Sequence, residues 1–202
     1  MAKGIRRWFP NAEIVSVDNT AEWNATHTMD IREFIMGAMH HYPPGYFDVL
    51  WASPPCTEYS NAKTVGIRDL ELADTRVAAA LTCIFHLQPK FWFLENPVGL
   101  LYTRPLMAPL RPFRRQADYC RYVELVKKPT HIWTNAILQS ELKVCRVSSP
   151  CRDRAKYGRH RKTSQSGPAG ETPGSGVGKN VYPLPQPLLD ELFRGLPGAG
   201  RV

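Results

Sequence analysis

Two short motifs carry the side chains best suited to chemistry. The stretch WASPPCTEYS at 51–60 places Cys56 after two prolines, and the stretch FWFLENP at 91–97 places Glu95 after four apolar residues. A thiolate is a strong nucleophile, and it attacks an electron-poor carbon if a nearby acid activates the target. A carboxyl held among apolar side chains has a raised pKa and can serve as that acid. We therefore predict that Cys56 is a nucleophile and that Glu95 is its acid partner.

A simpler interpretation of both residues stays open at this point. Cys56 would be a small buried apolar residue, since free cysteine is among the residue types most often found in protein cores. Glu95 would only cap a turn before Pro97. The two prolines before Cys56 favour the functional interpretation, because a core cysteine has no need of a stiffened loop.

The apolar pattern predicts the elements that position these residues. Strand-like runs cover 12–17, 47–52 and 91–96, and apolar residues recur at steps of three and four from 70 to 87, after Asp69. Strand, helix and strand in this order predict an α/β fold with a parallel sheet. In such sheets ligands bind at the carboxyl ends of the strands, where both motifs fall.

Composition narrows the class of protein. The 202 residues suffice for one domain with a core, and the formal charge of +8 fits attraction to a polyanion such as DNA. No stretch approaches the roughly 18 consecutive apolar residues of a membrane span, so we expect no membrane association. Five cysteines, an odd number, do not predict a disulfide framework and suit a reducing compartment. We expect a soluble intracellular protein, in the cytoplasm or nucleoid, or in the nucleus of a eukaryote.

The chain divides into three predicted parts. A catalytic domain is expected over 1–158, followed by a flexible basic loop rich in Gly, Ser and Pro over 159–180. The remaining segment, 181–202, is expected to form a C-terminal helix that packs back on the domain.

The two motifs together resemble the catalytic Pro-Cys and Glu-Asn-Pro motifs of the cytosine-5 DNA methyltransferases, in the same order and at similar spacing. The resemblance implies a Rossmann-like sheet with helices on both faces. It also implies methyl transfer from S-adenosylmethionine to carbon 5 of a cytosine flipped out of DNA, through a covalent adduct with Cys56. Glu95 would hold ring nitrogen 3 and the exocyclic amine of that cytosine.

The same resemblance assigns further residues. Asp18, at the end of an early strand, matches the acid that binds the ribose hydroxyls, and Asp30 matches the acid that receives the adenine amine. The cofactor-binding residues implied are Asp18, Asp30 and Pro54; the substrate-binding residues implied are Pro55, Ser60, Asn96, Pro97 and Arg121. For each aspartate, a carboxylate that only bonds a loop amide is the alternative.

One expected motif is not found. The family opens with a strand and a glycine-rich turn that holds S-adenosylmethionine, and only seventeen residues precede Asp18. We therefore expect a short form with its first strand missing, completed by a partner or an N-terminal segment. The alternatives are a catalytically inactive nucleic-acid-binding relative and, ranked lower, an RNA cytosine methyltransferase.

A second group of residues has the types of a zinc site. Cys145, Cys151 and His160 could ligate a metal, but the two cysteines lack the tight two-residue spacing and no fourth ligand is evident in the sequence. Cys120 or another histidine would have to complete the set. We assign no metal ligand from the sequence.

Overall fold

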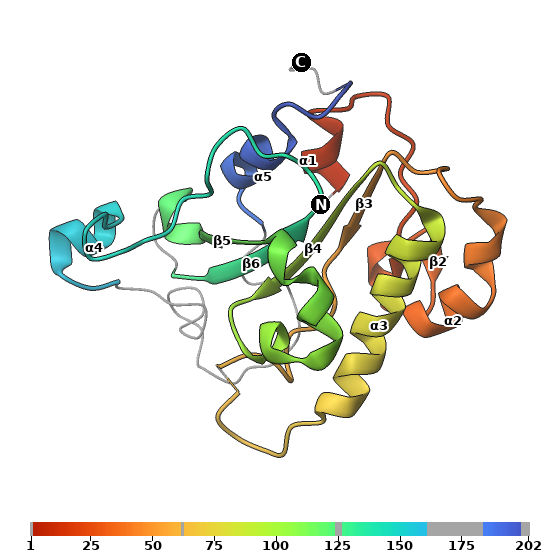
Figure 1. Ribbon diagram of the computed structural model, residues 1–202, viewed down its shortest axis with the longest axis horizontal. Coiled ribbons are helices and arrows are strands. Elements are labelled where there is room, and N and C mark those ends of the chain that lie inside the picture. Colours follow the sequence, from red (N-terminus) through yellow and green to blue (C-terminus); the bar gives the residue numbers. More distant parts are fainter. Residues whose placement is uncertain (1, 62, 124–126, 161–183, 199–202) are drawn as a thin grey trace. The chain divides into compact units, whose positions relative to one another are not determined.

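The computed structural model describes residues 2–61, 63–123, 127–160 and 184–198 as an α/β protein (Figure 1). Its helices and strands are α1 (Ala2–Arg6), β1 (Val17–Asp18), β2 (His27–Thr28), α2 (Ile31–Met36), β3 (Val49–Ala52), α3 (Leu70–Leu87), β4 (Phe91–Pro97), β5 (Arg114–Asp118), β6 (Pro129–Thr134), α4 (Arg152–Tyr157) and α5 (Gln186–Phe193). Short 3-10 helices connect them: η1 (Ala21–Trp23), η2 (Ala38–His41), η3 (Leu100–Thr103), η4 (Pro105–Phe113) and η5 (Tyr119–Arg121). The predicted fold class, an α/β protein, is confirmed.

The chain forms two compact units. Unit 1 comprises Met1–Ala12, Arg115–His131 and Ile137–Val202, and unit 2 comprises Glu13–Arg114 and Ile132–Ala136. The three-part division predicted from composition remains a prediction. Most of its middle part lies outside the described residues.

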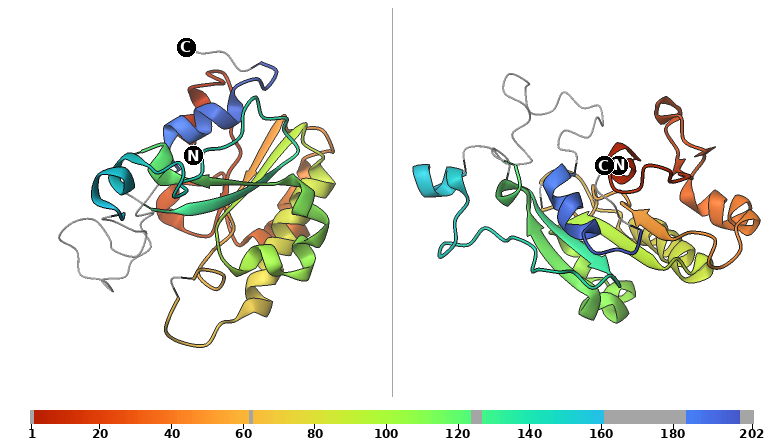
Figure 2. Two further views of the ribbon diagram at one scale, coloured as in Figure 1. Left: turned by 60° about the vertical axis from the view of Figure 1, so that its left-hand side comes forward. Right: turned by 90° about the horizontal axis from the view of Figure 1, so that it is seen from above.

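The centre of unit 2 is the crossover from β3 through α3 to β4. The two strands pair in parallel, with Val49 opposite Phe91 and Ala52 opposite Leu94. The rings of Trp51 and Phe93, opposite each other in this register, stack at a centroid distance of 5.4 Å. The parallel pair predicted from the apolar runs is therefore present, and Figures 1 and 2 show α3 lying beside it.

Helix α3 forms where its sequence predicts it. Asp69 is the N-cap, and its side chain accepts a hydrogen bond of 2.9 Å from the amide of Leu72. The helix ends at Gln88, whose φ of 45° is left-handed, immediately before Pro89. Its apolar face joins one core cluster with β4, η3, η4 and Trp133; the fully buried members include Tyr59, Val77, Leu94, Leu101 and Met107.

The early strand is shorter than the apolar run suggests. Only Val17–Asp18 is a strand, and it pairs in parallel with His27–Thr28 in a separate two-stranded sheet. The four-stranded sheet has the order β3-β4-β6-β5. Residues 12–16 lie outside regular structure, and the amide of Ser16 donates a hydrogen bond to the side chain of Thr26, whose amide donates one to the side chain of Ser16.

In unit 1, α5 packs against α1. The rings of Phe9 and Phe193 meet edge to face at 6.0 Å, and the indole nitrogen of Trp8 donates a 2.7 Å hydrogen bond to Asp190. The apolar face of α5 is buried, as expected for an amphipathic helix.

Within the described part of the chain, helices are too short or too polar to cross a membrane.

Candidate functional site

The two motifs end at the same edge of the sheet. Cys56 follows β3 by four residues, and Glu95 lies one position after Leu94, which pairs with Ala52, the last residue of β3. Since parallel strands have their carboxyl ends at one edge, both motifs lie at that edge of unit 2.

Direct bonds join the segments that follow the two strands. The side-chain amide of Asn96 donates a 2.9 Å hydrogen bond to the carbonyl of Pro54, and the amide of Leu100 donates one of 2.9 Å to the carbonyl of Tyr59. Ser60 and Gly99 form an antiparallel bridge between the same segments. We call residues 53–60, which carry the predicted nucleophile Cys56, the nucleophile loop. The bonds from Asn96, Gly99 and Leu100 fix the position of this loop relative to β4.

The nucleophile loop makes a tight turn at the cysteine. The carbonyl of Cys56 accepts hydrogen bonds from the amides of Tyr59 at 3.0 Å and Ser60 at 2.8 Å. Cys56 is half-buried and Pro55 is exposed, so the thiol is not sealed in the core. The alternative interpretation of Cys56 as a buried core residue does not fit this exposure.

Tyr59 anchors the loop on α3. Its ring is fully buried, and its hydroxyl donates a 2.7 Å hydrogen bond to Asp74, which also pairs with Arg104 at 2.7 Å. Burial and the Asp74 carboxylate raise the pKa of the Tyr59 hydroxyl, so the phenol stays neutral in the folded protein.

Two basic residues that follow the nucleophile loop bond to residues of the loop itself and to the segment just after it. Lys63 pairs with Glu58 at 2.6 Å, and the guanidinium of Arg68 donates to the carbonyls of Glu58, Ser60 and Lys63. Hydrogen bonds from Lys63 and from the amide of Asp69 lower the pKa of Glu58. The structure therefore gives Lys63 and Arg68 a positioning role in the segment that carries Cys56.

Glu95 and Asn96 lie inside unit 2. Glu95 is 8% exposed and Asn96 1%, and the preceding residues Trp92, Phe93 and Leu94 are buried. The Oδ1 atom of Asn96 is buried and accepts no hydrogen bond from the described residues. A buried carbonyl oxygen without a donor is costly, so a donor from a ligand would be favoured there.

The two aspartates predicted to bind the cofactor lie near the β1–β2 pair. One carboxylate oxygen of Asp18 accepts a 2.8 Å bond from the amide of Thr20, as in an Asx turn. Asp30 is the N-cap of α2 and accepts three bonds from Arg32, one from its amide and two from its guanidinium. The hydrogen bonds from Arg32 lower the pKa of Asp30 to about 2. Each aspartate therefore accepts a hydrogen bond from a nearby backbone amide, which is the alternative to cofactor binding considered in the sequence analysis.

Arg121 lies in unit 1, in η5. Its guanidinium donates a 2.6 Å hydrogen bond to the carbonyl of Pro150. Its Nε atom is buried and has no hydrogen-bond partner among the described residues. The predicted contact of Arg121 with substrate remains a prediction.

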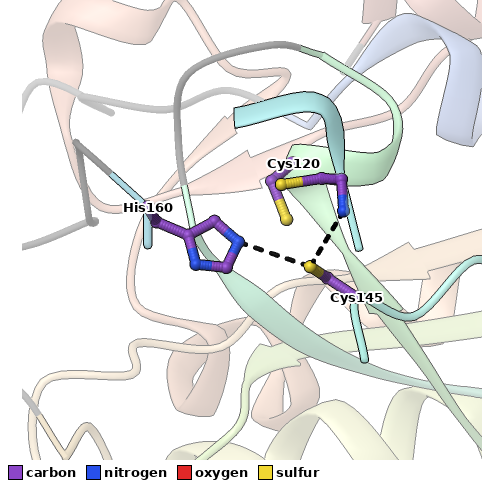
Figure 3. A group of neighbouring side chains, drawn as sticks. Cys120, Cys145 and His160 are labelled. Carbon is purple, nitrogen blue, oxygen red and sulfur yellow. Dashed lines mark hydrogen bonds between the residues drawn. The ribbon is translucent and has the colours of Figure 1, made fainter. Parts of the chain in front are cut away.

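Unit 1 also brings four potential metal ligands together. The ligand atoms of Cys120, Cys145, Cys151 and His160 all lie within 4.8 Å of one another (Figure 3). Burial raises the pKa of the Cys145 thiol, but hydrogen bonds from Cys151, Cys120 and Arg154 outweigh this and lower it overall. Burial also lowers the pKa of His160, helped by nearby Lys127 and Arg154, which favours a neutral imidazole.

Comparisons with known proteins bear on the site in unit 2. Protein-family models give no match to the chain. Over 106 residues the chain is 32% identical to a protein named "Probable DNA (cytosine-5)-methyltransferase" from Frog virus 3 (isolate Goorha), covering 46% of this chain and 48% of that one. The chain resembles a cytosine-5 DNA methyltransferase. This confirms the resemblance predicted from the two motifs, and the chain spans about half the length of the curated relative that it matches.

A solved structure from E. coli gives a weaker likeness. It is described as a "putative DNA modification methyltransferase encoded within prophage", with 15% identity, a TM-score of 0.38, and coverage of 65% of this chain and 36% of that one. A TM-score this low does not establish a common fold.

Two contributors to the candidate site in unit 2 are missing from the sequence-based prediction. Gly99 sits where a side-chain carbon would overlap the carbonyl of Tyr59, so its contact with the nucleophile loop requires glycine. Asp74 anchors Tyr59 from α3. Gly99 follows the Glu-Asn-Pro motif by two residues and could have been noticed. Asp74 carries no signal in the sequence, because it looks like any polar residue on a helix surface.

Proposed function

We propose that the chain acts as a DNA cytosine-5 methyltransferase, with Cys56 as nucleophile and Glu95 as acid. The observation that carries this proposal is the parallel register of β3 and β4 together with the Asn96–Pro54 hydrogen bond. These contacts hold the Cys56 loop and the Glu95-Asn96 pair at one strand edge. The name of the viral relative supports the substrate class.

The thiolate of Cys56 adds to carbon 6 of cytosine in the proposed reaction. A carbon–sulfur bond forms, and the electron pair of the 5,6 double bond moves to carbon 5, which becomes nucleophilic. After carbon 5 has received a methyl group, loss of its proton to a base and cleavage of the carbon–sulfur bond restore the double bond and the thiolate. The partial exposure of Cys56 allows a substrate to reach the sulfur.

Glu95 supplies the proton or hydrogen bond at ring nitrogen 3. This contact stabilises the negative charge that the sulfur adds to the ring, and the proton returns to Glu95 when the adduct breaks down. The other oxygen of the Glu95 carboxyl would accept a hydrogen bond from the exocyclic amine. Asn96 is the next residue of β4, so its side chain lies on the opposite face of the strand, and its proposed part is to hold the nucleophile loop through its hydrogen bond to the carbonyl of Pro54.

S-adenosylmethionine would supply the methyl group when bound. Asp18 fits this group, because one of its carboxylate oxygens accepts a hydrogen bond from the amide of Thr20 and the other can accept one from a ribose hydroxyl. Asp30 receives three hydrogen bonds from Arg32, and a carboxylate offers about four acceptor positions, which leaves room for one from the adenine amine. These residues therefore fit the adenosine part of the cofactor. Pro54, whose carbonyl accepts a hydrogen bond from Asn96, would also contact the cofactor.

The substrate base must leave the DNA stack to reach these groups, as in other enzymes that act on a base. Pro55, Ser60 and Pro97 flank the proposed pocket in sequence, and we assign them to contacts with the flipped nucleotide. Arg121 is proposed to contact a phosphate. The net charge of +8 favours attraction to DNA.

A nucleic-acid-binding protein without methyl transfer is the second candidate function. It is favoured by the local bonds of Asp30, whose carboxylate already accepts three hydrogen bonds from Arg32. Calorimetry with S-adenosylhomocysteine separates the two candidates. Binding that weakens in Asp18→Ala supports the enzyme, and an absence of heat at millimolar concentration supports the second candidate.

Trapping of a covalent adduct tests the proposed chemistry. Duplex oligonucleotides containing 5-fluorocytosine are incubated with the full chain and S-adenosylmethionine, and adducts are detected by denaturing electrophoresis and mass spectrometry. Fluorine at carbon 5 blocks the final elimination, so the wild-type protein is expected to remain attached to the DNA.

Two cysteine variants complete this experiment. Cys56→Ser is expected to give no adduct, whereas Cys83→Ser, which changes a buried cysteine of α3, should give the wild-type amount. An adduct that persists in Cys56→Ser would disprove the assignment of the nucleophile. The absence of any adduct in a wild-type protein that binds both DNA and S-adenosylhomocysteine would contradict the proposed mechanism.

A further inference from the structure

A cluster of three cysteines and one histidine lies in unit 1, in addition to the residues proposed for methyl transfer. Its ligand atoms lie within 4.8 Å of one another, and Cys145 Sγ is 3.4 Å from His160 Nε2. Figure 3 shows the side chains of Cys120, Cys145 and His160 converging. We propose that Cys120, Cys145, Cys151 and His160 bind one zinc ion with a structural role.

The spacing of the ligand atoms fits a tetrahedral metal. With zinc–sulfur bonds of about 2.3 Å and zinc–nitrogen bonds of about 2.0 Å, two sulfurs lie roughly 3.8 Å apart and a sulfur and a nitrogen roughly 3.5 Å apart. The four ligand atoms lie within 4.8 Å of one another, and Cys145 Sγ is 3.4 Å from His160 Nε2. Small movements of the side chains would therefore bring them to the distances of a zinc site. Three cysteines and one histidine form one of the ligand sets of structural zinc sites.

The four ligands come from separate points along unit 1. Cys120 lies in η5, Cys145 lies in the segment after β6, Cys151 is the N-cap residue of α4, and His160 follows α4. A single ion bound here would link η5 to both ends of α4. Such a link closes several loops at once and so reduces the entropy of the unfolded chain.

Helix α4 needs a restraint of this kind. It has six residues and none of them is buried, so an apolar face cannot hold it in place. A helix this short is unstable by itself in water. The metal would supply the energy that hydrophobic packing does not provide at this position.

The surrounding hydrogen bonds favour thiolate ligands. The amide of Cys151 donates to Cys145 Sγ at 3.3 Å, and the amide of Cys145 donates to Asp118 at 2.8 Å. Arg121, through its bond to the carbonyl of Pro150, fixes the residue before Cys151. Hydrogen bonds of this type to the ligands and their neighbours orient metal ligands and raise affinity.

Zinc is the metal best matched to this ligand set. Three soft sulfurs and one imidazole exclude Mg²⁺ and Ca²⁺, which require oxygen ligands, and a tetrahedral arrangement suits Zn²⁺. Binding converts three thiols to thiolates and releases up to three protons, leaving a site with a net charge of −1. Nearby basic side chains such as Arg154 and Lys127 offset this charge.

Metal analysis of the full chain tests the proposal. Protein without an affinity tag is expressed with zinc in the medium, dialysed, and analysed by inductively coupled plasma mass spectrometry. Roughly one zinc per chain is expected. Replacement by Co²⁺ should give the intense visible bands of tetrahedral thiolate coordination.

Matched variants separate ligands from ordinary cysteines. Cys145→Ser should weaken zinc binding by at least about a hundredfold in competition with a chromogenic chelator, whereas Cys83→Ser should not change it. His160→Cys should retain roughly one zinc, because it replaces one zinc ligand by another. If Cys145→Ser fails to fold, the two variants of His160 still test the proposal. Zinc should be retained in His160→Cys and lost in His160→Ala.

Three results would overturn the inference. One is folded wild-type protein, purified under reducing conditions, that contains less than about a tenth of a zinc per chain and binds no Co²⁺. Another is zinc that remains bound in both Cys145→Ser and His160→Ala. A disulfide between two of the three cysteines, detected by mass spectrometry in reduced preparations, would also contradict the proposal.

Discussion

At the residue scale, the role of Glu95 can be separated from its burial. Glu95→Gln keeps the size of the side chain and should fold normally, yet the methyl-transfer rate should fall by about two or more decades, because an amide cannot protonate ring nitrogen 3. The measurement is single-turnover transfer of labelled methyl groups to DNA. Glu71→Gln, on the exposed first turn of α3, should retain the wild-type rate. Unchanged turnover in Glu95→Gln would remove Glu95 from the mechanism.

The Asp30–Arg32 pair gives a pH-dependent prediction. The pKa of Asp30 is lowered from 3.8 to about 2, so the carboxylate form stabilises the fold above about pH 4 and this contribution is lost as the pH falls toward 2. Asp30→Ala also removes the N-cap of α2, and it should lower the free energy of unfolding at neutral pH by about 1 kcal/mol.

Urea denaturation at several pH values measures this effect. The difference between wild type and Asp30→Ala should shrink as the pH falls below about 4. Asp48→Ala removes an exposed ion pair with Lys90 and should change stability little at any of these values. A pH-independent difference for Asp30→Ala would show that the charge of Asp30 contributes nothing.

At the element scale, the contact between the nucleophile loop and the backbone after β4 depends on one glycine. In Gly99→Ala the new methyl group would overlap the carbonyl of Tyr59, so the two segments must separate. We expect a loss of stability of about 1–3 kcal/mol, as for other overpacked positions, and a loss of adduct formation with fluorocytosine DNA.

Gly37→Ala is the matched control for this substitution. A side-chain carbon at Gly37 would meet only the carbonyl of Glu33 at 3.8 Å, an ordinary contact. Its adduct yield should equal that of the wild type. Full adduct formation by Gly99→Ala would mean that the joined segments are not needed to position Cys56.

At the scale of the whole molecule, charge governs the expected affinity for DNA. Lysine and arginine number 26 against 18 acidic residues, so binding to a duplex should release counterions and weaken with salt. Fluorescence anisotropy with labelled duplex should show log K falling linearly with log salt concentration, at a slope of several units. Affinity that does not change with salt would exclude phosphate contacts as a main source of binding.

Several parts of the protein follow from local sequence alone. Helix α3 was predictable over its full length, because its apolar spacing, the Asp69 cap and Pro89 all act within a few residues. The strand ends after β3 and β4 were predictable for the same reason. The Pro-Cys and Glu-Asn-Pro motifs were enough to indicate the resemblance to cytosine-5 DNA methyltransferases that the viral relative also shows, while the roles of Cys56 and Glu95 stay predictions.

The tertiary structure decided which side chains meet. Asn96 bonds the carbonyl of Pro54, β1 pairs with β2 in a separate sheet, and Cys120 joins Cys145, Cys151 and His160. These contacts depend on the tertiary fold, which the spacing of residues along the sequence does not determine. Local propensities and caps are short-range, whereas a ligand set assembled from residues 120–160 exists only once the intervening chain has folded back on itself.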